Sequence, residues 1–510
     1  MNVVKKVNVI GGGTSGWISA AMLASSFRKT GRDIEVCLIE SPHIPTIGVG
    51  EGTFPTIVNT LQEIGLSEKD FLVECDAVFK QGAKFCNWLY DPSKKEHSYY
   101  HPFDPPAMPK GIDLSGYWLC DSDNKYGDSF AHSVTVQANL CDMNLPPKML
   151  DTSEYERLVR YAYHLDANKL GELIKRHSIN NLQVKYISAH IERVNLDRDG
   201  YISDVVSSDG DIYSADFFVD CSGFSSLLLG KTLQVPFVSK SQYLNVDTAV
   251  TVQIPYSENS EIPSHTISTA QECGWIWDIG LRTRRGTGYV YSSKHTTANR
   301  AEKVLLSYLG KEYKGEKLRH ISFDVGYREK FWEKNCVAIG FSSAFVEPLE
   351  ATAIAMVEAG VRSLAANFPI DRASMKPREK QYNRIFSQRW DNIIDFIKLH
   401  YCLTEREDTE FWRDQRSVET IPQSLQEKLE YWEHFSATEG DFPNRYDMFS
   451  LSSWQYILYG LKFKHKYAEC GILSDELMAK AFRSIQLMSK DAQSKLSSNK
   501  KFIEDYTKSD

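Results

Sequence analysis

At the start of the chain, strand-like runs of apolar residues alternate with a segment in which apolar residues have helical spacing. Residues 7–10 (VNVI) and 34–39 (IEVCLI) are short apolar runs of the kind that form buried strands. Between them lie a glycine-rich turn over 11–16 and a helical spacing of apolar residues over 17–28. A strand, a helix and a second strand within about 30 residues predict a βαβ unit with parallel strands.

Later segments continue both patterns. Residues 85–150 are irregular and rich in Pro, Asp and aromatic residues, so we expect loops or an antiparallel excursion there. A helix is predicted over 154–177, and a hairpin over 191–207 with its turn at Asp199-Gly200. Further strands are predicted at 183–187, 216–220, 248–254, 288–292 and 336–339. From residue 351 onward helices are predicted at 351–368, 375–402, 422–435, 450–463 and 474–496.

These elements together predict an α/β fold. A Rossmann-like domain opens the chain, a mainly antiparallel sheet is inserted into it, and a helical part follows. We expect one core with its inserted sheet over 1–370, and a helical C-terminal region over 371–510 that covers the substrate side.

Composition narrows the class of protein. The chain has 510 residues with 59 Lys and Arg against 67 Asp and Glu, and the resulting net charge of −8 disfavours nucleic acid as a partner. No apolar run of about 18 residues is present, so no membrane span is expected. No signal-type segment precedes the first strand, which predicts a cytoplasmic protein. The ten Cys form no Cys-x-x-Cys pair, so we expect reduced thiols and no metal site, while a homo-oligomer is left open.

The glycine-rich turn carries the first recognisable chemistry. Gly11-Gly12-Gly13-Thr14-Ser15-Gly16 matches the spacing G-x-G-x-x-G. In that motif the glycines permit a tight turn, a close approach of a pyrophosphate to the main chain, and close packing of helix on strand. Glu40, at the end of the second strand, is suited to accept hydrogen bonds from ribose hydroxyls. The segment therefore predicts a dinucleotide site, and a glycine-rich turn without a nucleotide is the alternative.

Two later strand ends favour FAD over NAD. Asp220-Cys221-Ser222-Gly223 and Ala338-Ile339-Gly340 each carry a predicted strand into a turn of small residues, far from the opening motif. An elongated FAD, lying across a chain that folds back on itself, explains such distant glycine-ended strands, although either could be an ordinary strand end.

Several stretches match one known family. The sequence resembles the flavin-dependent tryptophan halogenases and their relatives that act on other aromatics, over roughly residues 5–465. The Phe-Lys and Glu-Pro-Leu-Glu stretches are specific to these halogenases among FAD proteins, and the Trp-x-Trp stretch looks like the family motif held to disfavour monooxygenation. The matching stretches are 11–17, 44–53, 79–88, 163–166, 220–223, 274–277 and 345–352.

This resemblance implies an FAD-binding fold of the glutathione-reductase/monooxygenase type, and an enzyme that uses reduced FAD, oxygen and a halide ion. Hypohalous acid formed near the flavin would travel through an internal tunnel to a small aromatic substrate. No NAD(P)H site is evident beyond the FAD motif, so reduced FAD is expected from a separate flavin reductase. The implied cofactor contacts are Gly11, Gly13, Thr14, Ser15, Gly16, Trp17, Glu40, Ser41, Ile44, Ile47, Val49, Gly52, Ile191, Phe341 and Ile354.

Lys80 and Glu350 match the family's catalytic residues. The Lys80 ammonium would hydrogen-bond hypohalous acid, or its amine would form a haloamine, and either places an electrophilic halogen beside one ring carbon. Glu350 would polarise the bound oxidant and take the ring proton. The resemblance therefore implies that the two side chains meet in one enclosed chamber, which the tunnel joins to the flavin. Glu347 is expected to bond main-chain groups near a helix start. A solvated lysine and two helix-capping carboxylates are the structural alternatives.

The halide is expected at the N–H groups of Thr352 and Ala353, where a helix begins. The family usually has Thr-Gly there, so the extra methyl group leaves the preference among chloride, bromide and iodide open.

His101 and Phe103 fall where the family has aromatic substrate walls. Trp454 falls where tryptophan halogenases often carry a tyrosine pair for the amino-acid end of the substrate. Its presence favours a simpler indole, a phenol or a larger aromatic over free tryptophan. A second departure is Gly280, where the family's Trp-x-Trp motif normally continues to a Pro.

Two other function classes remain open. A flavin monooxygenase or reductase on the same scaffold would need no lysine–glutamate pair. A non-catalytic FAD-fold binding protein would need neither that pair nor the cofactor.

Overall fold

The computed structural model describes residues 3–44, 50–108, 111, 113–121, 123–257, 260–442, 444, 447–466 and 475–508. The chain forms two units, and each is built from three separate segments. The first unit comprises Met1–Ala77, Leu165–Lys240 and Asp324–Trp390. The second unit comprises Val78–His164, Ser241–Phe323 and Asp391–Asp510.

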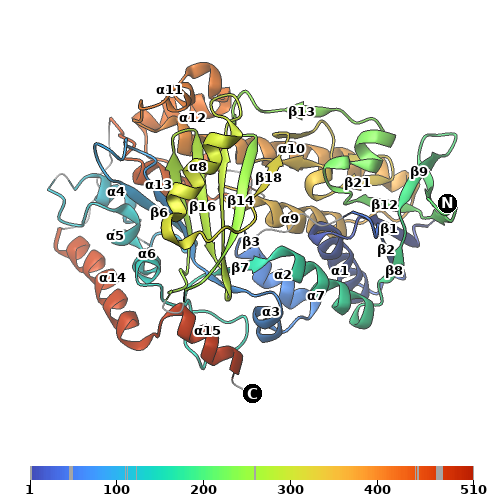
Figure 1. The fold of residues 1–510 in the computed structure, drawn as a ribbon, viewed down its shortest axis with the longest axis horizontal. Helices are drawn as coiled ribbons and strands as arrows, with labels where there is room; N and C mark the ends of the chain where they lie inside the picture. The colour runs from blue at the N-terminus through green and yellow to red at the C-terminus, as the bar shows by residue number, and fades with distance from the viewer. Residues whose placement is uncertain are drawn as a thin grey trace. The chain divides into compact units, whose positions relative to one another are not determined.

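The first unit is built on a six-stranded sheet in the order β20-β21-β12-β1-β2-β8, whose labelled strands can be followed in Figure 1. All neighbours are parallel except β20 and β21. Val7, Val9 and Phe218 in the central strands are fully buried, as expected for a parallel sheet covered on both faces. The strands are β1 (Lys6–Ile10), β2 (Glu35–Glu40), β8 (Lys185–Ser188), β12 (Phe217–Asp220), β20 (Trp332–Glu333) and β21 (Cys336–Ala338).

Helices and two small antiparallel sheets complete the first unit. Helix α1 (Thr14–Lys29) lies against α7 (Ala167–Asn181) and α9 (Thr352–Ala366). The other helices are α2 (Thr56–Ile64), α3 (Glu68–Glu74) and part of α10 (Arg372–Cys402). The small sheets hold β9 (Ile191–Leu196), β10 (Ile202–Ser207) and β11 (Ile212–Ser214), then β13 (Phe237–Ser239), β19 (Gly326–Arg328) and β22 (Ala344–Phe345), and β3 (Gly50–Gly52) lies apart from them.

The second unit is built on a seven-stranded sheet in the order β18-β14-β17-β16-β15-β5-β6. Only β5 and β15 run parallel among its neighbours, so the predicted mainly antiparallel sheet is confirmed. A separate antiparallel pair joins β4 (Val78–Lys80) to β7 (Ala162–Asp166). The sheet strands are β5 (Gly82–Cys86), β6 (Ser98–Pro102), β14 (Thr248–Pro255), β15 (Thr266–Gln271), β16 (Gly274–Gly280), β17 (Arg284–Tyr291) and β18 (Arg319–Ser322).

Nine helices of the described residues lie wholly within the second unit. They are α4 (Ser115–Leu119), α5 (Phe130–Val134), α6 (Val136–Asp142), α8 (Ala298–Leu309), α11 (Glu410–Gln415), α12 (Gln423–His434), α13 (Leu451–Gly460), α14 (Asp475–Lys495) and α15 (Asn499–Lys508).

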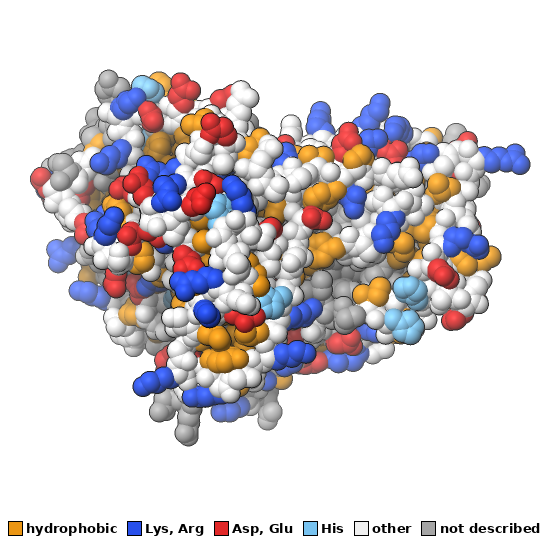
Figure 2. All heavy atoms as spheres, turned by 45° about the horizontal axis from the view of Figure 1, so that its top comes forward, with side chains coloured by type: hydrophobic (Ala, Val, Ile, Leu, Met, Phe, Trp, Pro, Cys, Tyr) orange, Lys and Arg blue, Asp and Glu red, His pale blue; other side chains and the backbone are white. Residues whose placement is uncertain are grey.

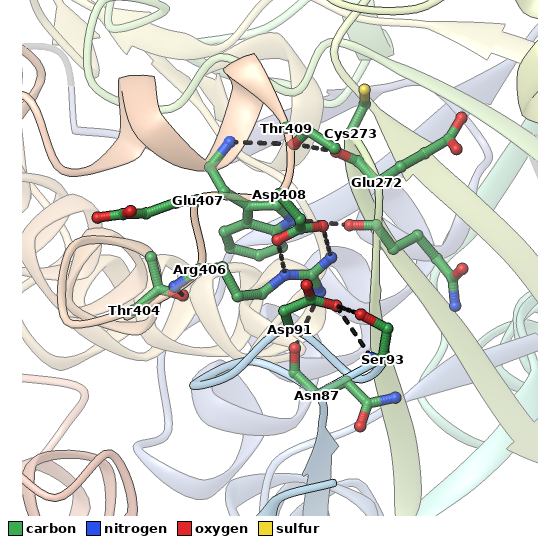
Figure 3. A network of polar contacts seen from close by, with 12 residues as sticks. Asn87, Asp91, Ser93, Glu272, Cys273, Thr404, Arg406, Glu407, Asp408 and Thr409 are labelled. Atoms are coloured by element: carbon green, nitrogen blue, oxygen red, sulfur yellow. Dashed lines mark hydrogen bonds and ion pairs between the residues drawn. The ribbon is translucent and has the colours of Figure 1, made fainter. Parts of the chain in front are cut away.

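A buried arginine ties residues 404–412 to the rest of the second unit (Figure 3). Arg406 donates two hydrogen bonds to the Asp408 carboxylate, at 2.9 and 2.7 Å, and a third to the main-chain oxygen of Asn87 at 2.9 Å. Its guanidinium lies 4.5 Å above the Trp412 ring, whose N–H donates to the oxygen of Gln271 at 2.8 Å. The loop before α11 is therefore fastened next to the end of β5, and α11 itself is fastened to β15.

The predicted fold class is confirmed, and two local predictions are wrong. The helix predicted over 154–177 does not begin until Ala167, because residues 162–166 form β7 instead. Eight described cysteines carry free thiols, but Cys120 is disulfide-bonded, against the expectation of reduced cysteines. Within the described residues no helix is long and apolar enough to cross a membrane. Lys and Arg lie interspersed with Asp and Glu on the face in Figure 2.

Candidate functional site

The start of α1 is shaped to receive phosphate groups. Gly11 has φ +115°, and a Cβ there would lie 2.2 Å from the Cys221 oxygen. A Cβ on Gly16 would lie 1.8 Å from the Gly11 oxygen, so both positions require glycine. Gly13 caps the helix without a side chain, and a Cβ on it would meet no atom within 4 Å. The first N–H groups of α1 therefore face open space, which suits a pyrophosphate.

Glu40 ends β2 beside this turn. One carboxylate oxygen accepts a hydrogen bond from Lys175 at 2.8 Å, and the Lys175 ammonium lies 4.3 Å from the Tyr186 ring and 5.7 Å from the Trp17 ring. A Cβ on Gly12 would lie 2.2 Å from the Glu40 carboxyl, so glycine makes room for that side chain. The ion pair holds Glu40 in place while its second oxygen can accept ribose hydroxyls.

Asp220 fixes the turn that follows β12. One carboxylate oxygen accepts from the Ser222 amide and hydroxyl, at 3.0 and 2.6 Å. The other accepts from the amides of Leu228 and Leu229, at 2.9 and 2.8 Å. Asp220 is fully buried, so these bonds replace the water it has lost. The residue is structural, and it shapes the wall formed by Cys221-Ser222-Gly223.

A cleft of about 520 Å³ joins these features within the first unit. This volume falls within the range of about 300–1,000 Å³ that is usual for small-molecule and cofactor sites. Gly16 and Gly52 do not line the cleft, nor does Trp17, which packs on Tyr186. Ile47 and Val49 lie outside the described residues. The predicted contacts that line it are Gly11, Gly13, Thr14, Ser15, Glu40, Ser41, Ile44, Ile191, Phe341 and Ile354.

Among the cleft residues that the sequence prediction did not name are Phe224, His190, Glu51 and Lys231. Phe224, which is 40% exposed, stacks on Phe341 with ring centroids 4.9 Å apart and gives the wall a flat aromatic surface. His190 bonds the Ser41 hydroxyl through Nδ1 at 3.0 Å. Glu51 and Lys231 also line the cleft. No motif marks Phe224, His190 or Lys231, whereas Glu51 lies within the family-like stretch 44–53 but was not assigned a role there.

The cleft fits FAD. Uncapped N–H groups, a glycine that leaves open space, and a carboxylate for a ribose lie along one wall, and apolar residues of α9 lie on another. The N-terminal end of α1 offers the positive partial charge that a pyrophosphate requires.

Helix α9 begins with an unusual main-chain conformation. Ala351 has φ 53° and ψ 39°, and no side chain of the described residues caps the helix. A cavity of about 20 Å³ lies next to this helix start and is lined by residues that include Phe345, Pro348, Thr352 and Ala353. A space of about 10–15 Å³ already holds one water, so an ion of similar size fits. Glu350 is 5% exposed.

Lys80 lies in the second unit at the end of β4. It is 4% exposed, so the alternative of a solvated surface lysine is wrong. Its ammonium lies 5.4 Å from the centre of the Phe103 ring, and the Phe103 amide donates to the Gln81 oxygen at 3.2 Å. Lys80 and Glu350 belong to different units, so their predicted meeting stays a prediction.

A buried histidine accompanies Lys80. The pairing of β4 with β7 sets Val78 opposite His164 and Lys80 opposite Ala162, which puts Lys80 and His164 on the same face of the pair. His164 bonds Thr266 through Nε2 at 2.8 Å. Burial first, and then the Lys80 charge, lower the pKa of His164 well below its usual value. His164 is therefore a neutral ring beside the ammonium.

The other predicted substrate residues have different degrees of burial. His101, on β6, is 3% exposed and lies among Phe396, Phe449 and Tyr456. Trp454, on α13, is 0% exposed and packs against Phe396, Trp432 and Phe442. Packing therefore accounts for Trp454, and its ring has no exposed face in this structure.

The Trp-x-Trp stretch lies on β16, a strand buried along its whole length. Gly288 on β17 allows the Trp277 ring to lie across it, since a Cβ there would lie 2.2 Å from that ring. A Cβ on Gly280 would lie 2.6 Å from the Tyr256 hydroxyl and 3.2 Å from Ile262. Tyr256 therefore occupies the space that a proline at position 280 would need.

Comparison with known proteins places this geometry in one family. The family model for tryptophan halogenases matches residues 6–471. The tryptophan 6-halogenase of Streptomyces toxytricini is 35% identical over 86% of this chain and 86% of its own. A crystal structure of a tryptophan halogenase from Shewanella frigidimarina has a TM-score of 0.95 and 38% identity, and covers 99% of this chain and 98% of its own.

A flavin-dependent halogenase from Brevundimonas is also similar. Its structure has a TM-score of 0.88 and 31% identity, and covers 99% of both chains. The chain therefore belongs to the tryptophan halogenase family, whose members are enzymes that use reduced FAD to halogenate an aromatic substrate.

Proposed function

We propose that this family member halogenates an electron-rich indole or phenol, or a related larger aromatic, rather than free tryptophan. The observation that carries the proposal is Trp454, which is fully buried among aromatic rings where a polar pair would serve an amino-acid end. An ammonium and a carboxylate on a substrate would each need hydrogen-bonding partners, and the Phe396 and Phe442 rings that pack on Trp454 offer none.

We propose that FAD occupies the cleft of the first unit, with its pyrophosphate at the start of α1. Reduced FAD supplies, with oxygen, the oxidising power that converts a halide ion into an electrophilic halogen. The family obtains reduced FAD from a separate flavin reductase. Gly13 and Ser15 would hold the pyrophosphate through main-chain N–H groups, and Glu40 would accept the ribose hydroxyls.

The halide is proposed to bind at the start of α9. Thr352 and Ala353 border the small cavity there, and their N–H groups belong to an uncapped helix start. Although the Ala353 methyl crowds this site relative to glycine, bromide and iodide are oxidised more easily than chloride, so we expect them to be used better.

Lys80 is proposed to hold the electrophilic halogen. A buried ammonium next to the Phe103 ring is suited to hydrogen-bond hypohalous acid and to fix its direction. The neutral His164 ring adds no competing charge on that face of the strand pair. Glu350 is proposed to accept the proton that leaves the ring, which is worth about two to four powers of ten in rate.

One experiment tests the substrate class. The protein is incubated with a flavin reductase, FAD, oxygen and an equimolar mixture of indole, phenol and free tryptophan, with chloride, bromide or iodide in turn. Mass spectrometry is expected to find halogenated indole or phenol, with more product from bromide or iodide. Preferential halogenation of free tryptophan would contradict the proposal, and a hydroxylated product independent of halide would favour a monooxygenase.

A variant tests the catalytic assignment. Lys80→Ala is expected to abolish halogenation and to leave the dissociation constant of FAD unchanged, because Lys80 does not line the cleft. Lys84→Ala is a suitable control, since Lys84 lies on the neighbouring strand and forms an ion pair with Asp142 at 3.0 Å. Halogenation retained by Lys80→Ala would remove this residue from the mechanism.

A further inference from the structure

An acidic residue lines the cleft close to where an anionic cofactor is expected. Glu51 lies on β3 and borders the same cavity as Gly13 and Glu40. Unlike Glu40, which is paired with Lys175, Glu51 has no ion pair among the described contacts. A carboxylate in this position would repel the pyrophosphate and would lose its water when a cofactor fills the cleft. Both effects disfavour the charged form.

The surroundings of Glu51 already favour its neutral form. Burial raises the pKa of Glu51 to about 7, and the negative charge of Asp166 adds to this effect. Asp166 is held in place as the cap of α7, where it accepts from the amides of Asn168 and Lys169 at 2.9 and 3.1 Å. Asp166 is the charged side chain, among the described residues, that acts on Glu51.

Other charged or titratable side chains on the cleft wall are Glu40, His190 and Lys231. Glu40 is held by Lys175. A histidine next to phosphate groups is a general source of pH-dependent binding, and His190 lines the same cleft. Any test must therefore separate Glu51 from His190.

We propose that Glu51 is a neutral carboxylic acid when FAD occupies the cleft, so that the protein takes up a proton at this residue as the cofactor binds. The neutral acid keeps negative charge away from the pyrophosphate and offers an O–H donor to the cofactor. This inference rests on the proposal that FAD occupies the cleft.

The direction of the pH dependence follows from the thermodynamic linkage between proton binding and FAD binding. FAD adds negative charge and removes water, so it favours the protonated form of Glu51 further. Above pH 7 the free protein must first bind a proton, and the affinity for FAD falls as the pH rises. If binding shifts the titration by one unit, the dissociation constant rises about five-fold between pH 6 and pH 8.

The experiment measures the dissociation constant of oxidised FAD at pH 6, 7 and 8. Oxidised FAD has no group that titrates in this interval. The unaltered protein and His190→Gln should both show the five-fold weakening, whereas Glu51→Gln, which stays neutral, should bind equally well at all three values. The proposal is overturned if the affinity of Glu51→Gln for FAD still falls between pH 6 and pH 8, or if the affinity of the unaltered protein does not fall.

A second measurement needs no variant. Titration calorimetry at pH 7, in two buffers with different ionisation heats, counts the protons exchanged on binding. Net uptake is expected, and no uptake overturns the proposal even if Glu51→Gln fails to fold.

Gly13→Val separates this inference from the assignment of the cleft. A Cβ at this position points into open space with no protein atom within 4 Å, so valine should block FAD without disturbing the fold. Gly171→Ala, on α7, also meets no atom within 4 Å and serves as the matched control. If Gly13→Val still binds FAD, both proposals are wrong. If Gly13→Val loses FAD binding but binding to the unaltered protein does not depend on pH, only the role of Glu51 is wrong.

Discussion

At the scale of single residues, Ala351 stores strain directly before α9. Its φ of 53° lies in the left-handed region, which costs a residue with a Cβ about 1–2 kcal/mol. Glycine pays no such cost but loses more entropy on folding. We therefore expect Ala351→Gly to raise the free energy of unfolding by about 0.5–1 kcal/mol, as measured by chemical denaturation.

The control for this prediction is Ala353→Gly, two residues further along. Ala353 lies within the helix, so glycine there should lower the free energy of unfolding by up to about 1 kcal/mol. Equal effects of the two substitutions would show that the main-chain conformation of Ala351 is not strained.

Glu358, on α9, makes stability depend on pH. It is 1% exposed and accepts hydrogen bonds from the hydroxyls of Thr56, at 2.9 Å, and Thr60. Burial raises the pKa of Glu358 to about 7, although these hydroxyls and Arg362 act in the opposite direction. The folded state therefore holds this proton more tightly than the unfolded chain, and the resulting stability is lost as the pH rises from 5 to 8.

Glu358→Gln removes that titration while keeping the shape of the side chain. The unaltered protein should lose about 2 kcal/mol more of its free energy of unfolding than this variant when the pH is raised from 5 to 8. Denaturant unfolding of both proteins at both pH values measures the difference. Glu63→Gln, whose exposed carboxylate pairs with Arg362, is the control and should show little of this gain. A pH dependence identical to that of the unaltered protein would contradict the assignment.

Residues of the cleft differ in how far the sequence alone could predict them. Gly11 and Gly16 could be predicted, because their role depends on contacts within one βαβ unit and the strand next to it. His190 and Phe224 could not, since they reach the cleft only after three distant segments of the first unit come together. Cys120 illustrates the same limit, because cysteine spacing did not reveal its disulfide.

At the scale of elements, the junction of β7 and α7 shows why a helix start was misplaced. Residues 154–166 were predicted as helix, but residues 162–164 pair with β4, and this long-range pairing overrides local preference. Asp166 is the N-cap of α7 and accepts two amide hydrogen bonds. An Asp directly before a helical pattern is a start signal, so the correct boundary was present in the sequence.

The attachment of residues 404–412 to the second unit depends on Arg406. Removal of its side chain leaves Asp408 and the Asn87 oxygen without their donors and exposes the Trp412 ring (Figure 3). We expect Arg406→Met to lower the free energy of unfolding by about 2–4 kcal/mol in chemical denaturation.

The matched control is Arg300→Met. Arg300 forms a comparable bidentate pair with Glu272 at 2.8 and 2.7 Å, but its side chain is 58% exposed. That pair should contribute less than about 1 kcal/mol. Equal losses from the two variants would mean that burial of Arg406 adds nothing.

At the scale of the whole molecule, the two units interleave in sequence. The sequence predicts a boundary at residue 370, whereas each unit draws on three segments of the chain. Periodicity detects the elements along a chain but not the order in which they join a sheet. It therefore does not reveal where the chain passes from one unit to the other. The proposed catalytic residues are distributed accordingly, with Glu350 in the first unit and Lys80 in the second.

The central claim is that the Lys80 ammonium and the Glu350 carboxylate meet in one chamber. A carbodiimide couples an amine and a carboxylate into an amide only where the two groups touch, so it detects this contact directly. Lys428 and Asp395, which are 2.6 Å apart, provide a partly buried positive control, and Glu350→Gln provides the negative control. After proteolysis, mass spectrometry should find a peptide that links Lys80 to Glu350 in the unaltered protein and not in Glu350→Gln. A linked control pair with no Lys80–Glu350 peptide, or Lys80 joined to another carboxylate, would contradict the account.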